Sequence, residues 1–396
     1  MSPLVPDRPT VRTGLDRLVA DPSLIGAGRV GLVTNFTGVT ADLRRGVDRL
    51  LSRGVGVTVL LGPEHGLRGT AQAGESEGEA VDPATGLPVV DTYLMPADVL
   101  DQRIRESGVD ALVFDMQDVG TRYWTYTSTM YDCMASAARC GIGFVVLDRP
   151  NPLGGRAVEG PGLEPGLRSF VGRVDVPLRH GLTSGELARL IARVAPETGV
   201  PMPPVEVVAV EGWEDRGPAR TTGLPWVPPS PNLPTADTAQ VYPATGLIEG
   251  VNVSEGRGTT RPFETIGAPF VDGKFSALLD EQELPGVVFR DTWFRPVFHK
   301  YAGETIRGVA LHVTDQEGFL PVRTGLTILW ALAALYPGQF RVLRGEERGT
   351  KGEPACSLDR LWGSDTLRRA IEQGDPRDLV TPPTTPGAWY PEGVLA

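Results

Sequence analysis

Four short apolar runs, each leading directly into a cluster of polar residues, constrain the fold of this chain more than any other feature. The runs are Val30–Thr34, Val57–Leu61, Ala111–Asp115 and Gly143–Asp148. Amphipathic segments separate them, among them Ser128–Cys140, and Thr183 with Glu186 forms a capping-box pattern that predicts a helix through about Val194. Apolar runs that alternate with amphipathic segments are typical of parallel strands covered by helices on both faces. The pattern predicts an α/β fold with a Rossmann-like parallel sheet.

The length of 396 residues favours two domains, because single hydrophobic cores stop growing well below that size. A stretch rich in proline and glycine, residues 217–243, follows the sheet-forming part. Further strands are expected at Phe289–Phe298 and Ile306–Val313, and helices at Leu326–Tyr336 and Asp359–Gln373. We therefore predict a Rossmann-like domain over residues 1–280 and a smaller C-terminal α/β domain over residues 281–396.

The polar clusters that follow the four runs are the first candidates for a site. They contain Asn35, the pair Glu64 and His65, the pair Asp115 and Asp118, and the pair Arg149 and Asn151. In open parallel sheets ligands bind beyond the carboxyl ends of the strands, where loops and helix N-termini converge. For each cluster taken alone, turn capping or local ion pairing is the favoured explanation. Their coincidence at one predicted edge favours a binding site there.

Glu64 and His65 form the most distinctive pair, because Gly62, Pro63 and Gly66 flank them and hold them on a stiff turn. A carboxylic acid in a partly apolar cleft keeps its proton near neutral pH and can protonate a leaving oxygen. The alternative is structural: His65 would form a core hydrogen bond, and Glu64 would anchor a neighbouring arginine.

The segment 252–264 is dense in hydrogen-bonding groups. Its candidate residues are Asn252, Ser254, Arg257, Thr259, Arg261 and Glu264. Arginine can bind a carboxylate bidentately, and hydroxyl and amide groups suit the hydroxyl and acetamido groups of a sugar. A phosphate ligand would satisfy the same residues, and such loops also occur as plain turns.

Aromatic residues cluster behind Arg122, which is itself a candidate for substrate binding. Tyr123, Trp124 and Tyr126 follow it closely, and aromatic faces beside polar groups are typical of surfaces on which a sugar ring rests. The same residues fit the core of the following helix equally well.

Several function classes are disfavoured. A formal net charge of -11 argues against nucleic acid as a partner. The chain has no GxGxxG after the first run, no GxxxxGK[ST] and no HExxH, so we expect no dinucleotide, nucleotide or metal cofactor. The longest apolar run is too short to span a bilayer, and residues 1–12 do not resemble a secretory signal. We expect no membrane partner and a cytoplasmic location.

Several uncommon motifs occur in order along the chain and carry a family resemblance. They are Gly62-Pro-Glu-His-Gly-Leu-Arg-Gly69, Asp115-Met-Gln-Asp-Val-Gly-Thr-Arg122, Leu147-Asp-Arg-Pro-Asn-Pro152, Ser230-Pro-Asn-Leu-Pro-Thr235 and Gly256-Arg-Gly-Thr-Thr-Arg-Pro-Phe-Glu264. With these motifs the chain resembles the exo-β-N-acetylmuramidase family, NamZ-like proteins of glycoside hydrolase family 171, formerly DUF1343. The likeness covers nearly the whole chain.

The resemblance implies a cleft between two domains that takes a non-reducing terminal N-acetylmuramic acid and hydrolyses its β-1,4 bond without a cofactor. It implies Glu64 as the first candidate for an acid or base, and Asp115, Asp118 or Glu264 for a second carboxylate. Asn232 lies in a matching motif and is a further candidate for substrate binding. Where Glu255 stands, the family commonly has a less charged residue, so this side chain is expected to alter how a lactyl carboxylate is held.

Three mechanisms stay open at this point. Enzymes whose two catalytic carboxyl groups lie about 5 Å apart retain the anomeric configuration. Enzymes in which these groups are separated by roughly 6.5 to 9.5 Å invert it. Attack by the substrate's own acetamido group needs only one strong acid. The rival functions are a non-catalytic protein that binds muropeptides or anionic sugars and, ranked third, an enzyme that acts on phosphoesters or nucleotide sugars.

Overall fold

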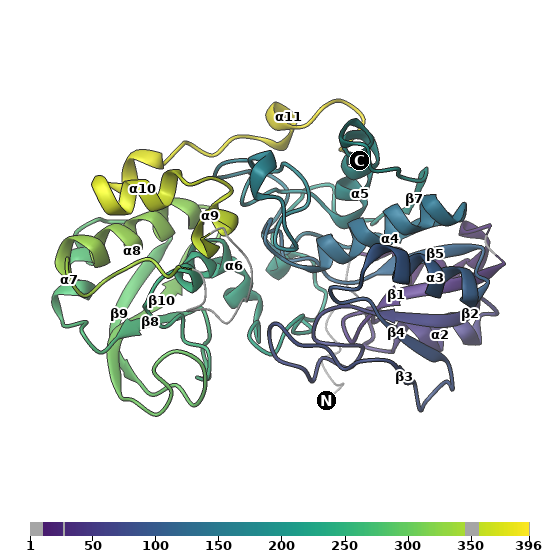
Figure 1. Cartoon of the computed structure of the whole chain (residues 1–396), viewed down its shortest axis with the longest axis horizontal. Coiled ribbons are helices and arrows are strands. Elements are labelled where there is room, and N and C mark those ends of the chain that lie inside the picture. Colours follow the sequence, from purple (N-terminus) through teal and green to yellow (C-terminus); the bar gives the residue numbers. More distant parts are fainter. Residues whose placement is uncertain (1–10, 27, 345–355, 396) are drawn as a thin grey trace, which may run out of the picture.

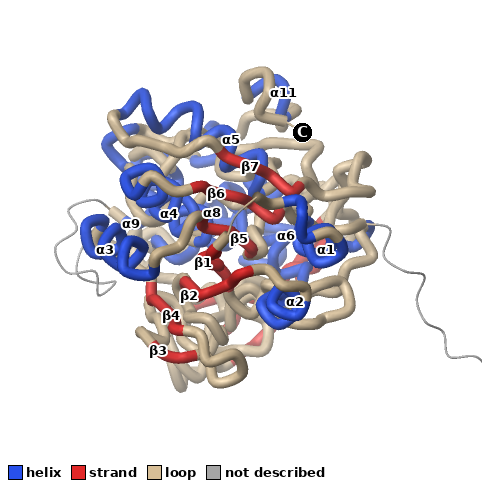
Figure 2. Tube along the Cα trace, turned by 90° about the vertical axis from the view of Figure 1, so that its right-hand side faces the viewer, coloured by secondary structure: helices blue, strands red, loops and turns tan. Residues whose placement is uncertain are grey.

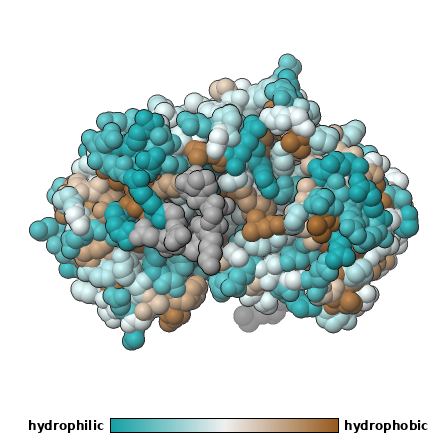
Figure 3. All heavy atoms as spheres, in the orientation of Figure 1, coloured by the Kyte–Doolittle hydropathy of each residue, from teal (hydrophilic) through white to brown (hydrophobic). Residues whose placement is uncertain are grey.

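The protein has two lobes that lie side by side, with the parallel sheet in one and a smaller sheet in the other (Figure 1). We describe it from a computed structural model over residues 11–26, 28–344 and 356–395. Residues 1–10, which make up most of the segment 1–12 that does not resemble a secretory signal, lie outside the described residues. On the face shown in Figure 3, hydrophilic side chains cover much of both lobes. No helix in the described ranges has the length and apolar character needed to cross a bilayer.

The larger lobe contains a seven-stranded sheet in the order β3-β4-β2-β1-β5-β6-β7. Its strands are β1 (Arg29–Thr34), β2 (Gly56–Gly62), β3 (Ala80–Val81), β4 (Pro88–Asp91), β5 (Ala111–Asp115), β6 (Gly143–Leu147) and β7 (Val205–Val208). All neighbouring pairs are parallel except β3 with β4. The four predicted runs correspond to β1, β2, β5 and β6, so the Rossmann-like parallel sheet is confirmed.

Helices cover both faces of this sheet. They are α1 (Gly14–Ala20), α2 (Gly46–Ser52), α3 (Ala97–Ser107), α4 (Tyr126–Cys140) and α5 (Ser184–Val194). Viewed along the sheet, α3 and α4 lie on one face, and α1 and α2 lie on the other (Figure 2). The strands are apolar on both sides: in β5, Leu112 and Phe114 join one core cluster and Val113 joins the other. The predicted capping box of Thr183 and Glu186 is present at the start of α5.

The smaller lobe has an antiparallel sheet in the order β8-β10-β9 with helices packed against it. Its elements are α6 (Ala236–Thr245), β8 (Thr265–Ala268), α7 (Lys274–Asp280), β9 (Val287–Phe294), β10 (Ile306–Val313), α8 (Pro321–Leu335), α9 (Ser357–Trp362) and α10 (Thr366–Gln373). The single helix expected over 359–373 is two helices, because Gly363 ends α9 in the left-handed region at φ 95°. The predicted boundary at residue 280 falls inside this lobe, since β8 and α7 precede it.

The end of the chain returns from the smaller lobe to the larger one (Figure 1). There Thr384 pairs with Val158, and after α11 (Pro386–Trp389) the hydroxyl of Tyr390 donates to the carbonyl oxygen of His180 over 2.7 Å. One hydrophobic cluster also runs from the sheet into α8 of the smaller lobe. The two lobes therefore share a core and a crossing segment.

Candidate active site

A cavity of about 840 Å³ is lined by residues of both lobes. The larger lobe contributes Glu64, His65, Gln72, Ala73, Gly74, Tyr93, Tyr123, Trp124, Thr125, Val171, Ser230 and Leu233. The smaller lobe, with α6 and the segments that follow it, contributes Tyr242, Glu249, Asn252, Arg257, Phe263, Phe298, His299, Lys300, Tyr301, Arg341, Leu343 and Leu361. Six sequence-predicted site residues are thus brought together at one cavity: Glu64, His65, Tyr123, Trp124, Asn252 and Arg257.

Glu64 is fixed at the carboxyl end of β2, where the strand turns into the loop that forms one wall of the cavity. Its side chain is buried, yet it reaches the cavity lining. One carboxylate oxygen accepts a hydrogen bond of 2.6 Å from the backbone N–H of Gly74, and the other accepts one of 2.5 Å from the hydroxyl of Thr125. Because both oxygens are bonded, the orientation of the carboxyl group is set before any ligand binds.

His65 sits on the same turn with a left-handed backbone, φ 72°. Its Nδ1 lies 3.1 Å from the carbonyl oxygen of Ala71 and 3.3 Å from that of Gln72. Both neighbours are acceptors, so Nδ1 carries the proton and donates. The ring also packs near Trp124, with 6.5 Å between the ring centroids. The bond that was expected for His65 as a structural residue is therefore present, although the ring still lines the cavity.

Arg257 lies in the cavity wall formed by the smaller lobe, held between two acids and a ring. Its Nη2 donates to Glu249 over 3.1 Å, its Nε lies 3.3 Å from Glu255, and its guanidinium stands 4.8 Å from the centroid of Phe263. No hydrogen-bond acceptor for Nη1 is found in the described part of the chain. A fixed guanidinium with one nitrogen left to donate is suited to a carboxylate ligand.

Glu255 is fully buried behind this wall and joins three basic side chains. Besides Arg257, it lies 3.0 Å from Nζ of Lys300 and 3.0 Å from Nδ1 of His299. Burial alone would raise the pKa of this carboxyl, but Lys300, together with His299 and Arg257, holds the pKa of Glu255 well below its usual range. Lys300 also donates to the carbonyl oxygens of Ile248 and Val253. Glu255 is thus a buried counter-ion for the basic wall.

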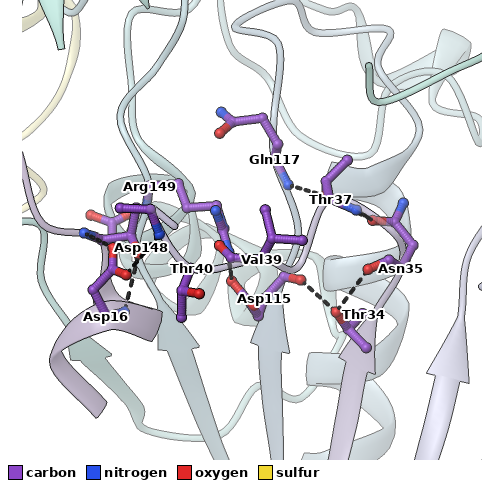
Figure 4. A network of polar contacts seen from close by, with 12 residues as sticks. Asp16, Thr34, Asn35, Thr37, Val39, Thr40, Asp115, Gln117, Asp148 and Arg149 are labelled. Atoms are coloured by element: carbon purple, nitrogen blue, oxygen red, sulfur yellow. Dashed lines mark hydrogen bonds and ion pairs between the residues drawn. The ribbon is translucent and has the colours of Figure 1, made fainter. Parts of the chain in front are cut away.

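Asp115, Arg149 and Asn35 form a different, closed network at the ends of β1, β5 and β6 (Figure 4). The Arg149 guanidinium lies 2.7 Å from the Asp115 carboxylate and donates to the carbonyl oxygen of Val39, while the amide oxygen of Asn35 accepts from the N–H and hydroxyl of Thr37. The loop after β1 crosses over these groups, and none of them lines the 840 Å³ cavity. At the strand-order reversal between β1 and β5, the usual ligand position in such sheets, the protein leaves only a small pocket of about 40 Å³ beside Arg149.

Asp118, Asn151 and Tyr126 also lie outside the cavity lining. The carboxylate of Asp118 accepts from the N–H of Gly120 and lies 3.2 Å from Nε2 of buried His180. The amide of Asn151 bonds to two backbone groups, and the hydroxyl of Tyr126 donates to a backbone carbonyl oxygen. These side chains hold loops in place around the sheet edge.

Arg122 is almost completely buried and binds protein backbone. Its guanidinium donates to the carbonyl oxygens of Pro161 and Val176 and, across the two lobes, to that of Leu361 in α9. Burial lowers the pKa of Arg122 to about 10. The three acceptors place this arginine between the lobes rather than at the cavity surface.

Within segment 252–264 the cavity is lined by Asn252, Arg257 and Phe263. Glu264 accepts from Thr238 and from the guanidinium of Arg261, whereas Ser254 and Thr259 bond to the backbone of their own turns. None of the four candidates Ser254, Thr259, Arg261 and Glu264 lines the cavity.

The side chains of the remaining candidates, Asn252, Tyr123 and Asn232, form hydrogen bonds to other groups of the protein. Both ends of the Asn252 side-chain amide are bonded to the backbone of an adjacent segment. The hydroxyl of Tyr123 donates to the carbonyl oxygen of Tyr242. Asn232 lies outside the lining, but its amide donates to the side chain of Gln72, which lines the cavity. Asn232 therefore supports the wall from behind.

Sequence reasoning missed several residues of the lining, above all Thr125, Tyr93, Glu249 and the segment 298–301. Thr125 lies within the aromatic cluster, directly after Tyr123 and Trp124, so the sequence could have predicted it as a site residue. The segment 298–301 gave no local signal, because His299 and Tyr301 take left-handed backbones, φ 67° and 58°, that only their tertiary contacts support.

Comparisons with known proteins match most of the chain. The family model of the N-terminal part of exo-β-N-acetylmuramidase NamZ matches residues 30–237, and the model of its C-terminal part matches residues 240–382. The chain is 44% identical over 370 residues to the peptidoglycan β-N-acetylmuramidase NamZ of Bacillus subtilis, covering 93% of this chain and 86% of that protein.

Two solved structures of DUF1343 family proteins from Bacteroides fragilis are also similar. One has a TM-score of 0.80 at 33% identity and covers 93% of each chain. The other has a TM-score of 0.69 at 29% identity and covers 93% of this chain and 92% of its own.

Proposed function

Because the chain belongs to the exo-β-N-acetylmuramidase NamZ family, we propose that it is an exo-acting glycoside hydrolase that releases non-reducing terminal N-acetylmuramic acid from peptidoglycan fragments. The reaction breaks the β-1,4 bond between the anomeric carbon and the oxygen of the next sugar. One water molecule is consumed: its hydroxyl group ends on the anomeric carbon and a proton ends on the departing oxygen.

The observation that carries the proposal is that Glu64 and Arg257 line the same cavity. Glu64 supplies the carboxyl group that gives a proton to the departing oxygen and later takes one from water. Arg257 supplies the donor for the lactyl carboxylate, which distinguishes N-acetylmuramic acid from N-acetylglucosamine. The 44% identity to a peptidoglycan β-N-acetylmuramidase favours a saccharide hydrolase over a protein that only binds anionic sugars.

The cavity favours assistance by the acetamido group of the substrate. Among the described residues that line it, Glu64 and Glu249 carry the carboxyl groups, and Glu249 is bonded to Arg257. Asp115, Asp118 and Glu264 are each engaged elsewhere. With Glu64 as acid and base, the acetamido carbonyl oxygen attacks the anomeric carbon, and water then opens the cyclic intermediate.

The test is turnover of a chromogenic β-glycoside of N-acetylmuramic acid by the wild type and by Glu64→Gln. Glutamine keeps the shape and can bond to Gly74 and Thr125, but it cannot transfer a proton. We expect kcat to fall by roughly a hundred- to ten-thousand-fold, the usual contribution of general acid–base catalysis. Glu281→Gln, at an exposed position of the smaller lobe, is the matched control.

Turnover by Glu64→Gln at the wild-type rate would remove Glu64 from the chemistry. Equal wild-type turnover of the N-acetylmuramic acid and N-acetylglucosamine glycosides would contradict the specificity. Calorimetric binding of the intact disaccharide without any product would favour the binding protein instead.

A further inference from the structure

Tyr93 emerges beside Glu64 from the neighbouring strand. In the parallel pair of β2 and β4, Gly62 is in register with Asp91. Glu64 and Tyr93 each follow two residues later, and adjacent strands lie about 4.8 Å apart. Both side chains line the cavity. The pairing of β2 with β4 therefore places the carboxyl group of Glu64 and the phenol of Tyr93 at the same end of the site.

The loops that carry these two residues are also bonded to each other. The carboxylate of Asp91 accepts from the N–H of Tyr93 and from the hydroxyl of Ser76. Ser76 lies in the same loop as Gly74, whose N–H donates to Glu64. Thr92, between Asp91 and Tyr93, donates its hydroxyl to the carbonyl oxygen of Gly62. The position of Tyr93 is thus tied to that of Glu64.

The hydroxyl of Tyr93 differs from those of other tyrosines at the cavity. Tyr123 donates to the carbonyl oxygen of Tyr242, and Tyr301 donates to that of Asn252. For Tyr93 the described residues provide no hydrogen-bond partner at the hydroxyl, while its ring packs edge-on against Phe170 with 5.4 Å between centroids. The ring is held and the hydroxyl is left for a ligand.

We propose that Tyr93 is a second residue at the reacting centre, and that its hydroxyl donates a hydrogen bond to the acetamido carbonyl oxygen of the terminal sugar. This inference rests on the proposed function. Two saccharide oxygens take part in bond making and breaking at the anomeric carbon, and the departing one receives its proton from Glu64. The acetamido oxygen is the acceptor that remains for a neighbouring donor, and a hydrogen bond there orients it toward the anomeric carbon.

The chemistry of the phenol agrees with this role. Burial, together with the charges of Glu64 and Asp91, raises the pKa of Tyr93 to about 12. The hydroxyl therefore keeps its proton throughout the pH range of the reaction. It acts as a neutral donor that positions a group, and it leaves proton transfer to Glu64.

The experiment compares Tyr93→Phe with the wild type in turnover and in binding. Phenylalanine keeps the packing on Phe170 and removes only the hydroxyl. We expect kcat/KM for the N-acetylmuramic acid glycoside to fall about tenfold, as for one lost hydrogen bond. In calorimetry, free N-acetylmuramic acid should bind several-fold more weakly, whereas its analogue with a hydroxyl in place of the acetamido group should bind equally to both proteins. Tyr131→Phe on α4 makes the same chemical change outside the cavity lining and serves as the control.

Two outcomes would overturn this assignment while leaving the proposed function intact. One is unchanged turnover and binding in Tyr93→Phe, and the other is an equal loss of affinity for both sugars. Absence of any hydrolysis by the wild type would instead refute the proposed function and the role of Tyr93 with it.

Discussion

Replacement of Arg257 tests how the cavity recognises an anionic sugar. In Arg257→Gln the lactyl carboxylate loses its donor, and Glu249 and Glu255 lose the guanidinium between them. A hydrogen bond between charged groups contributes about 1.5–3 kcal/mol. At about 1.4 kcal/mol for each factor of ten, kcat/KM should fall roughly 10- to 150-fold for substrates that carry the carboxylate.

The assay uses two chromogenic glycosides that differ only at the lactyl group, one with the free carboxylate and one with its uncharged amide. For the wild type, the carboxylate form should be preferred. In Arg257→Gln the preference should disappear, because only the charged substrate loses an interaction. Arg257→Lys should fall between the two proteins, since lysine keeps the charge without the planar fork.

Thermal unfolding must accompany these measurements, because Arg257 also holds two acids in place. Arg307→Gln removes an arginine that pairs with Asp291 on the same lobe, away from the cavity lining, and serves as the control. An equal loss for the charged and uncharged glycosides in Arg257→Gln would refute carboxylate recognition and would leave Arg257 with a purely structural role.

Two further predictions concern buried carboxyl groups at the sheet edge: Asp115 of the closed network, and Asp148, which directly follows β6. Asp115→Asn leaves the buried guanidinium of Arg149 without its counter-ion, so urea unfolding should show a loss of about 3–5 kcal/mol; wild-type stability with abolished turnover would return Asp115 to the catalytic candidates. Burial raises the pKa of Asp148 to about 6, against hydrogen bonds from Gly185 and Thr183 that oppose the shift. Since this folded-state pKa lies above the unfolded value of 3.8, the stabilisation from Asp148 is complete below about pH 3.8 and disappears as the pH rises through 6. Asp148→Asn should remove a pH dependence on the order of 3 kcal/mol between pH 4 and 7, and an unchanged slope in urea titrations at several pH values would contradict the shift.

Local patterns were sufficient for the sheet and for the Glu64 turn. The strands follow from apolar runs that must be covered on both faces, and α5 follows from the capping box of Thr183 and Glu186. Glu64 could be chosen because glycine and proline fix its turn wherever the rest of the chain lies. These features depend on residues that are close together in the sequence.

Long-range packing decided which polar residues reach the cavity, and sequence patterns carry little of that information. Asp115 and Arg149 end neighbouring strands just as Glu64 does, but the loop after β1 covers them and they pair with each other. The short β8 is a further example, because it is recognisable as a strand only through its pairing with β10. Lys300 reaches Glu255 from a segment without regular structure.

The position of Arg122 bears on how a glycan end enters the protein. One guanidinium joins backbone from both lobes, and the returning C-terminal segment fastens them a second time through Tyr390. Opening the lobes as a hinge would break these buried bonds at a cost in free energy, so the bonds favour a constant separation of the cavity walls. A site of constant width requires no ordering when it is filled, and therefore retains more of the contact energy as affinity. A site of constant width also admits only ligands whose shape fits its opening. It would therefore select the ends of glycan chains by their shape.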